Sequence, residues 1–231
     1  MTAVSARIVL CRTDAKLESA ALEMVQRWMP ASEVEGIRRL RRWEDAQASS
    51  IGGSCFRCSA GWQLMAPDRC IGTAEGGRVS LSMFLSVIDC ILSHCSGYVV
   101  AAVSENGRVG IDVETDGGRD PSVDADFLTP SELAWLCDAG PPDGRSAIRL
   151  WTLKEAYVKG TGEGLARNVL TLDFEMSAPR ITVRVRGKPE ETERWHFRSR
   201  SLPEAWLSIS NEFVEPPADV TLIGCREVAR M

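Results

Sequence analysis

Two short stretches of the sequence place acidic and basic residues at spacings that suit metal and phosphate chemistry. RVGIDVET carries Asp112 and Glu114 two positions apart inside an apolar run. LWTLKEAYVKGTGEGL carries Glu155 and Lys159 four positions apart. The two stretches are either two halves of one site or two ordinary elements that happen to carry charge.

In a β-strand, residues two positions apart point to the same face, so Asp112 and Glu114 are expected to lie side by side. Two adjacent carboxylates repel each other unless a cation lies between them. Magnesium is the expected cation because it takes hard oxygen ligands. The alternative is a solvated strand face, because a two-residue pattern is common by chance.

The second stretch is expected to be helical, which places Glu155 and Lys159 on one side of the helix. The alternative here is a simple surface ion pair. Lys154 lies beside them, and a glycine-rich loop follows the helix. One acid and two lysines near magnesium suit a diphosphate substrate, because the acid completes the metal shell and the lysines neutralise phosphate oxygens.

The elements that must position these residues are predicted by hydrophobic periodicity and by capping signals. Strands are expected over 6–11, 98–104 and 108–114, the last two joined as a hairpin by the turn ENG. Helices are expected over 14–29, from Pro30 through about Ser50, over 129–140 with Thr129 as cap, and over 146–160. Several short strands follow, so the chain is predicted to be α+β, with two lobes of similar size and a boundary near residue 105.

Composition limits the classes of protein that fit. The 231-residue chain has a formal net charge of −5, which argues against a general nucleic-acid binder. It contains no apolar run long enough to cross a bilayer and no signal-peptide core, so we expect a cytoplasmic protein. Eight cysteines are irregularly spaced, and we expect reduced core residues; a zinc site at CFRC (55–58) is the alternative.

The order GIDVE followed by WTLKEAYVKGTGEGL resembles the signature of the 4'-phosphopantetheinyl transferases of the Sfp type. RRLRRWEDAQASSIGG, GGRV and LSHCSGYVVAAVS are similar to further elements of that family. The resemblance runs from about Pro30 to Leu172. It implies an α+β fold of two pseudo-symmetric lobes, with the active site in the cleft between them. Residues 1–105 would hold the nucleotide of coenzyme A, and residues 106–231 the metal, the pyrophosphate and the carrier protein.

The resemblance also implies a role for each matched residue. Asp112, Glu114 and Glu155 would hold Mg²⁺, and Glu155, or a water that it orients, would take the proton of a carrier-protein serine. Lys154 and Lys159 would contact the pyrophosphate. Catalysis would therefore depend on Glu155, Asp112 and Lys159. Residues matching the nucleotide-binding positions of the family are Gly77, Arg78, Ser93 and His94.

The activity implied is transfer of the phosphopantetheine arm of coenzyme A to an acyl or peptidyl carrier protein, with release of 3',5'-ADP. A monomer would suffice, because one chain supplies both lobes. The first half departs from the family pattern: Ala48 replaces an expected arginine, and Val79 an expected proline. These departures allow a second interpretation of the sequence. In it, the chain is a diverged homologue that binds coenzyme A or a carrier protein without transfer. The neighbouring arginines (38, 39, 41 and 42) either replace the missing contact or form a solvated helix face.

Overall fold

The computed structural model describes the chain over the following residues: 6–13, 15–27, 29–59, 78–83, 86–105, 107–116, 126–138, 144–164, 167–176 and 180–228. For 55–59, 78–83 and 86–88 it describes the backbone alone. Helices and three β-sheets share the chain, which confirms the predicted α+β class. No helix among the described residues is long and apolar enough to span a membrane.

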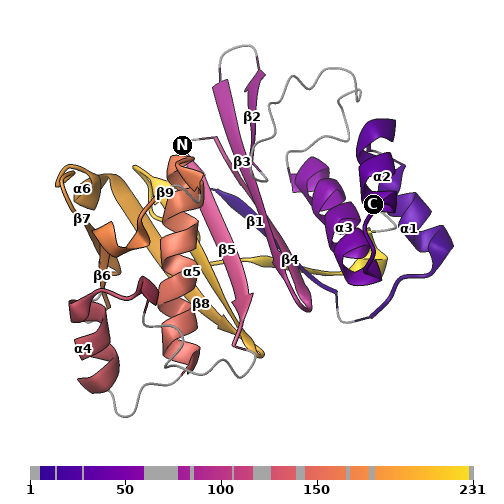
Figure 1. The fold of residues 1–231 in the computed structure, drawn as a ribbon. Coiled ribbons are helices and arrows are strands. Elements are labelled where there is room, and N and C mark those ends of the chain that lie inside the picture. Colours follow the sequence, from indigo (N-terminus) through magenta and orange to yellow (C-terminus); the bar gives the residue numbers. More distant parts are fainter. Residues whose placement is uncertain are drawn as a thin grey trace.

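The first lobe is a five-stranded sheet with helices on its outer face (Figure 1). Its strand order is β10-β1-β4-β3-β2. The strands are β1 (Arg7–Arg12), β2 (Arg78–Met83), β3 (Ser86–Cys95), β4 (Tyr98–Ser104) and β10 (Thr221–Gly224). The helices are α1 (Ser19–Gln26), α2 (Ala31–Arg38), α3 (Trp43–Ser59) and α7 (Cys225–Val228).

The second lobe contains a three-stranded sheet of order β5-β9-β8 and a two-stranded sheet, β6-β7. Its strands are β5 (Val109–Thr115), β6 (Leu172–Glu175), β7 (Thr182–Val185), β8 (Trp195–Leu202) and β9 (Ala205–Glu212). Its helices are α4 (Pro130–Asp138), α5 (Gly144–Thr161), the 3-10 turn η5 (Val169–Thr171) and α6 (Glu191–Arg194).

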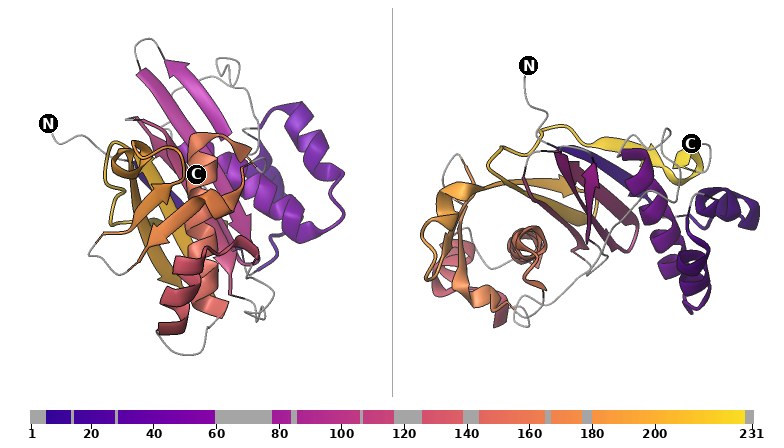
Figure 2. Two further views of the ribbon diagram at one scale, coloured as in Figure 1. Left: turned by 60° about the vertical axis from the view of Figure 1, so that its left-hand side comes forward. Right: turned by 90° about the horizontal axis from the view of Figure 1, so that it is seen from above.

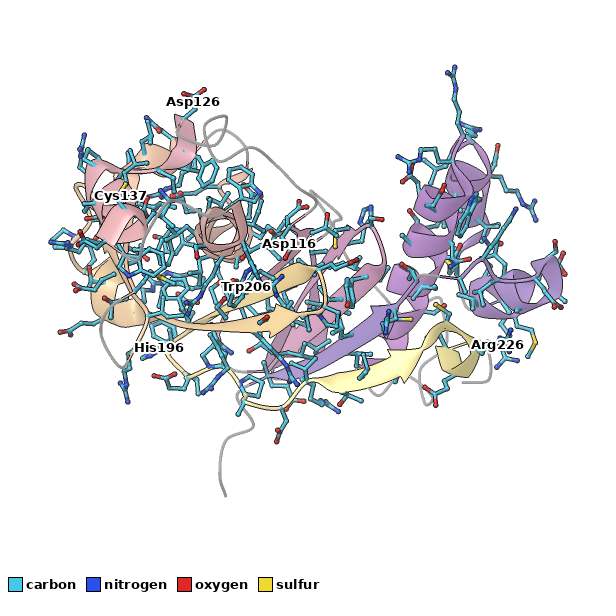
Figure 3. The ribbon with its side chains drawn as sticks, turned by 90° about the horizontal axis from the view of Figure 1, so that it is seen from below. Asp116, Asp126, Cys137, His196, Trp206 and Arg226 are labelled. Atoms are coloured by element: carbon cyan, nitrogen blue, oxygen red, sulfur yellow. The ribbon has the colours of Figure 1, made fainter. Side chains whose placement is uncertain are left out.

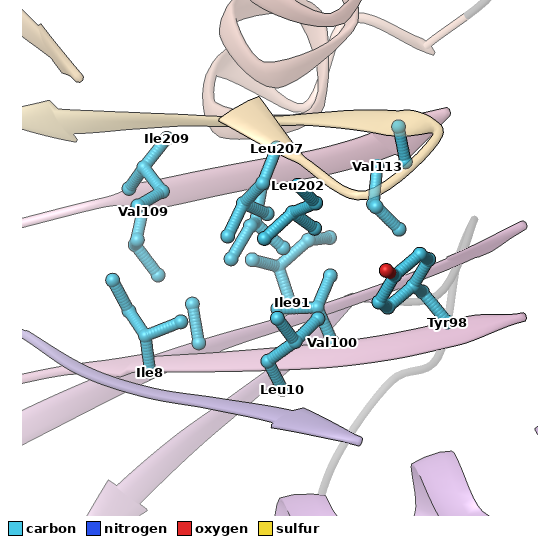
Figure 4. Close-up of a cluster of buried hydrophobic side chains, with 13 residues drawn as sticks. Ile8, Leu10, Ile91, Tyr98, Val100, Val109, Val113, Leu202, Leu207 and Ile209 are labelled. Carbon is cyan, nitrogen blue, oxygen red and sulfur yellow. The ribbon is translucent and has the colours of Figure 1, made fainter. Parts of the chain in front are cut away.

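The two larger sheets pack face to face, and their shared core joins the lobes (Figure 4). Alternate residues of β5, namely Val109, Ile111 and Val113, point into this core and are fully buried. Leu207 and Ile209 of β9 join them from the same sheet. Because successive side chains of a strand point to opposite faces, the intervening residues of β5 must point the other way.

The outer face of each large sheet carries one long helix, α3 on the first lobe and α5 on the second (Figures 1 and 2). Helix α3 continues through Gly52, where an added Cβ would lie 2.7 Å from the Leu92 side chain of β3. Helix α5 packs on a second hydrophobic cluster that includes Leu150, Leu153 and Tyr157. Each long helix therefore covers the outer face of one sheet.

Three sequence predictions about the fold were wrong in detail. The strands β4 and β5 do not form a hairpin, because β1 and β3 occupy both edges of β4 while β5 pairs with β9. The helix expected after Pro30 is two helices, which are separated by residues 39–42. Residues 221–228, expected in the second lobe, lie in the first, since β10 pairs with β1.

Candidate active site

The strand β5 and the helix α5 lie unusually close together, and this closeness depends on Gly110. A Cβ at Gly110 would lie 1.8 Å from the backbone oxygen of Ala156. Gly110 therefore faces α5, and so do Asp112 and Glu114, which follow at alternate positions. The sequence prediction that the two acids share one face agrees with this backbone.

A compact polar cluster joins Asp112 to the second half of α5 and to the first lobe. The Lys159 ammonium donates to Asp112 Oδ1 at 2.6 Å and to Ser93 Oγ at 2.9 Å. Ser93 Oγ in turn donates to Asp112 Oδ1 at 2.8 Å. Asp112 is only 3% exposed, whereas the Lys159 side chain is 24% exposed. The cluster is thus anchored in the interior and reaches solvent through the lysine.

Glu155 lies one helical turn before Lys159, and its carboxylate is perturbed by the cluster. Burial, followed by the negative charge of Asp112, raises the pKa of Glu155, and Lys159 opposes the shift. Burial and the charges of Glu114 and Asp112 also raise the pKa of the Cys95 thiol to about 12. The charge of Asp112 raises the pKa of both Glu155 and Cys95, so these groups and Glu114 share one small region. Cys95 stays a neutral thiol there.

Side chains of β3 satisfy the unpaired edge of β5 and fix the position of the cluster. The backbone N–H of Val109 donates to Asp89 Oδ2 at 2.8 Å, and the N–H of Val113 donates to Ser93 Oγ at 3.4 Å. These contacts join the two lobes at the site. Asp89 was not identified from the sequence, because its role depends on a strand edge that only the tertiary fold creates.

The fit of this region to a divalent cation rests on one atom of Asp112. Its Oδ2 is buried and has no hydrogen-bond partner among the described residues, while Oδ1 is bound by Lys159 and Ser93. A buried carboxylate oxygen without a donor is costly unless a cation meets it. Within the described part of the chain, no three acidic, cysteine or histidine side chains are gathered closely enough to hold a metal. Asp112 Oδ2 and the neighbouring Glu155 nevertheless fit a cation ligand pair, with Glu114 on the same strand face.

Lys154 lies on the opposite side of α5 and conflicts with its predicted role as a pyrophosphate contact. Its side chain is fully buried, and its ammonium is 2.7 Å from Glu132 Oε2. It also donates to the backbone oxygens of Phe127, Val169 and Leu172, at 2.7, 3.2 and 3.0 Å. Burial lowers the pKa of Lys154, and Glu132 opposes the shift. All its donors are used internally, so Lys154 has no proton left for a phosphate.

A signal for this placement was present in the sequence. Leu150, Leu153, Lys154 and Tyr157 recur at the spacing of one helical stripe, so Lys154 occupies a position of the buried face. A buried lysine requires an anion, and that anion is Glu132, held in place by N–H donors from Thr129 and Phe174. The mutual bonds of Thr129 and Glu132 form a capping box at the start of α4, where Thr129 was the predicted cap.

The predicted nucleotide-binding residues are only partly brought to this cluster. Ser93 belongs to it, whereas His94 follows on the opposite face of β3 and is exposed. Gly77 lies outside the described residues, and for Arg78 the backbone alone is described, as also for the CFRC cysteines. Ala48, at the place of the family's expected arginine, is buried against α1 and β4.

A family model agrees with the position of the site. Residues 108–213 match the model described as the 4'-phosphopantetheinyl transferase superfamily. That range contains Asp112, Glu114, Glu155 and Lys159. Residues 108–213 are therefore similar to this superfamily.

Curated proteins that are similar to this chain are named as transferases of the same kind. A 4'-phosphopantetheinyl transferase, gsp, from Aneurinibacillus migulanus is 37% identical over 75 residues, which are 32% of this chain and 31% of that protein. A 4'-phosphopantetheinyl transferase, psf-1, from Bacillus pumilus is 25% identical over 167 residues, 71% of each chain. The first match therefore spans about a third of that relative's length, and the second about seven tenths.

Among solved structures, the holo-[acyl-carrier-protein] synthase (AcpS) of Thermotoga maritima aligns with a TM-score of 0.39 and 20% sequence identity. The alignment covers 45% of this chain and 61% of that one.

Proposed function

We propose that this chain transfers the 4'-phosphopantetheine arm of coenzyme A to a serine hydroxyl of an acyl or peptidyl carrier protein. The observation that carries the proposal is the cluster of Lys159, Asp112 and Ser93, in which one buried carboxylate oxygen of Asp112 is left without a donor. The match of residues 108–213 to the superfamily model supports the same activity.

The reaction exchanges one phosphorus–oxygen bond for another. The serine oxygen bonds to the β-phosphorus of coenzyme A, and the bond from that phosphorus to the bridging oxygen breaks. The leaving 3',5'-ADP keeps the electron pair, and Glu155 takes the serine proton directly or through water. A raised pKa suits Glu155 to this task, because a base accepts a proton best when its pKa approaches the working pH.

Lys159 supplies positive charge where charge develops on the pyrophosphate. Its ammonium is held by Asp112 and Ser93, so it is positioned before the substrate arrives. Asp112, Glu155 and Glu114 would hold Mg²⁺, which when bound neutralises phosphate charge and polarises the phosphorus–oxygen bonds. Lys154 takes no part in phosphate contact in this proposal. It fixes the helix that carries Glu155.

The proposal is tested by incubating the protein with coenzyme A, magnesium and a panel of apo-carrier proteins, and by following the mass of each carrier. We expect a gain of one phosphopantetheine group on at least one carrier. Addition of EDTA is expected to stop the gain, and excess magnesium to restore it. No gain on carriers from fatty-acid, polyketide and nonribosomal-peptide systems would overturn the proposal.

A second candidate function is a homologue that binds coenzyme A without transfer, and the burial of Ala48 favours it. An alanine in the core cannot replace an arginine that holds a phosphate. Calorimetry with coenzyme A and with dephospho-coenzyme A separates the two cases. Equal affinities would show that the 3'-phosphate is not anchored. Binding of coenzyme A without any carrier mass gain would favour this second function.

The cytoplasmic location and the monomeric state of the protein stay predictions.

A further inference from the structure

Arg149 of α5 carries a partly buried guanidinium that has no counterion in the part of the chain that the structure describes. Among the described residues it forms no ion pair, and its Nε is buried with no hydrogen-bond partner. Among the described residues, its guanidinium contacts the ring of Trp206, whose centroid lies 5.0 Å from the guanidinium carbon. A partly desolvated cation attracts an anion, so Arg149 is able to bind one that comes from outside the described residues.

A second arginine lies on the same ring. The guanidinium carbon of Arg145 is 5.5 Å from the Trp206 centroid, and the Arg145 side chain is 37% exposed. Arg145 pairs with Asp116 and donates to Ser201 Oγ at 2.6 Å. Figure 3 shows Asp116 and Trp206 beside the end of α5. Asp116 thus pairs with Arg145, and no acid within the described ranges pairs with Arg149.

The helix end adds positive character to this region. Arg145 and Arg149 lie in the first two turns of α5, and no acidic residue occupies its first turn. The N-terminus of a helix carries partial positive charge and favours anions. Two guanidinium groups, a helix N-terminus and one paired acid therefore make a surface that attracts a carboxylate or a phosphate.

This region adjoins the candidate active site on the side away from Lys159. Trp206 of β9 lies directly opposite Glu114 of β5, so both side chains are on the α5 face of the sheet. Arg149 and Lys159 are ten positions apart on α5, which corresponds to about 15 Å along the helix. The proposed pyrophosphate contact and the Arg149 region thus lie at opposite ends of the reacting centre.

We propose that Arg149, with Arg145 and Trp206, binds a carboxylate on the protein that accepts the phosphopantetheine arm. The inference rests on the proposed function, and it adds a docking contact for the acceptor. The geometry favours the acceptor over coenzyme A, because the pyrophosphate is assigned to Lys159, the nucleotide with its 3'-phosphate is assigned to the first lobe, and the transferred pantetheine arm carries no acid. A guanidinium binds a carboxylate through two parallel hydrogen bonds, which also fixes orientation.

The test compares Arg149→Gln with the wild-type protein in steady-state transfer assays, using an acidic apo-carrier protein that the wild type modifies. We expect KM for the carrier to rise about tenfold, since one charge-assisted contact is lost, while KM for coenzyme A stays unchanged. The KM of Arg149→Lys for the carrier is expected to lie between the values of the wild type and Arg149→Gln. The matched control is Arg186→Gln, which removes one exposed arginine far from α5 in the sequence, and its KM for the carrier is expected to match that of the wild type.

Salt provides a second readout that loss of folding does not imitate. Transfer by the wild type is expected to weaken more steeply with sodium chloride than transfer by Arg149→Gln, because the attraction to the carrier is screened. Thermal unfolding of each variant identifies any loss of folded protein. An unchanged KM for the carrier with equal salt dependence would overturn the inference. A rise in KM for coenzyme A instead would also overturn it and would assign Arg149 to the donor.

Calorimetric titration of the carrier into the protein without coenzyme A separates this inference from the proposed function. If no transfer occurs but carrier binding depends on Arg149, the proposed function fails and the docking contact stands. If transfer occurs and carrier binding is the same for Arg149→Gln, the docking contact fails and the proposed function stands. If neither transfer nor Arg149-dependent binding is seen, both are overturned.

Discussion

The two lysines of α5 belong to regions with opposite character. Lys154 is fully buried and enclosed by Glu132 and three backbone oxygens. Lys159 lies five positions later, faces β5 and keeps a quarter of its side chain exposed while it contacts Asp112. The closed region ties the helix to its surroundings, and the open region is the one that we propose contacts the substrate. A motif that places two lysines beside one glutamate therefore does not give both lysines the same task.

The largest expected effect is on the stability of the protein, when the buried ion pair of Lys154 with Glu132 is removed. Lys154→Met leaves the Glu132 carboxylate buried without its cation, and we expect a loss of about 3–5 kcal/mol in the free energy of unfolding. Urea unfolding measures this loss. The double variant Lys154→Met with Glu132→Gln removes both charges and is expected to recover part of the stability. If Lys154→Met keeps wild-type stability but loses transfer, the comparison between the two lysines is wrong.

The next largest effect is expected on the rate of transfer, when Lys159 of the open region is replaced. Lys159→Met is expected to lower kcat by about a hundredfold or more, because a positioned charge near the pyrophosphate is lost. The unfolding midpoint should fall less than in Lys154→Met, since the Lys159 side chain is partly exposed and Ser93 still donates to Asp112. Steady-state assays and thermal unfolding measure the two quantities. Wild-type kcat in Lys159→Met would remove the lysine from the proposed chemistry.

A smaller effect is expected from separating the helix from the strand that carries the acids. Gly110→Ala places a methyl group against the Ala156 backbone, so α5 must shift, at a cost of about 1–3 kcal/mol and with reduced transfer. Gly36→Ala is the matched control, because nothing lies within 4 Å of the added Cβ in α2. The control is expected to be neutral or to gain up to about 1 kcal/mol. Equal behaviour of the two variants in urea unfolding would show that the close approach is unimportant.

The smallest effect is expected at the contact between the lobes. Ser93→Ala removes the bond to Asp112 and the acceptor for Lys159, and we expect a loss of about 1 kcal/mol in stability. Transfer should fall less than in Lys159→Met, because the ion pair with Asp112 remains. A larger fall in transfer than in Lys159→Met, seen in the same assay, would assign a direct role in substrate binding to Ser93.

The local part of the site was predictable from the sequence. Strand alternation predicted that Asp112 and Glu114 share a face, and helical spacing predicted the same for Glu155 and Lys159. The resemblance to a family predicted that the two pairs meet. The shared faces and the contact of Lys159 with Asp112 agree with the structure, because they depend on backbone periodicity within one element and on a motif that combines two elements. The chemical roles of these residues stay predictions.

The parts that were missed depend on contacts between distant residues. Glu132 pairs with Lys154 across 22 positions, and Asp89 meets the edge of β5 from the other lobe. The pairing of β10 with β1 joins the two ends of the chain, and β4 had no free edge for the predicted hairpin. No local pattern encodes such contacts. The helical stripe that includes Lys154 did indicate from the sequence that this lysine is buried. It did not identify Glu132 as the acid that pairs with it.

The most direct test of the account follows the mass of an apo-carrier protein with the wild type and with Asp112→Ala, under coenzyme A and magnesium. We predict that the wild type adds one phosphopantetheine group, and that Asp112→Ala, at equal folded concentration, adds it at least about a thousandfold more slowly because the cluster loses its central carboxylate. Transfer at the wild-type rate by Asp112→Ala, or no transfer by either protein, would contradict the account.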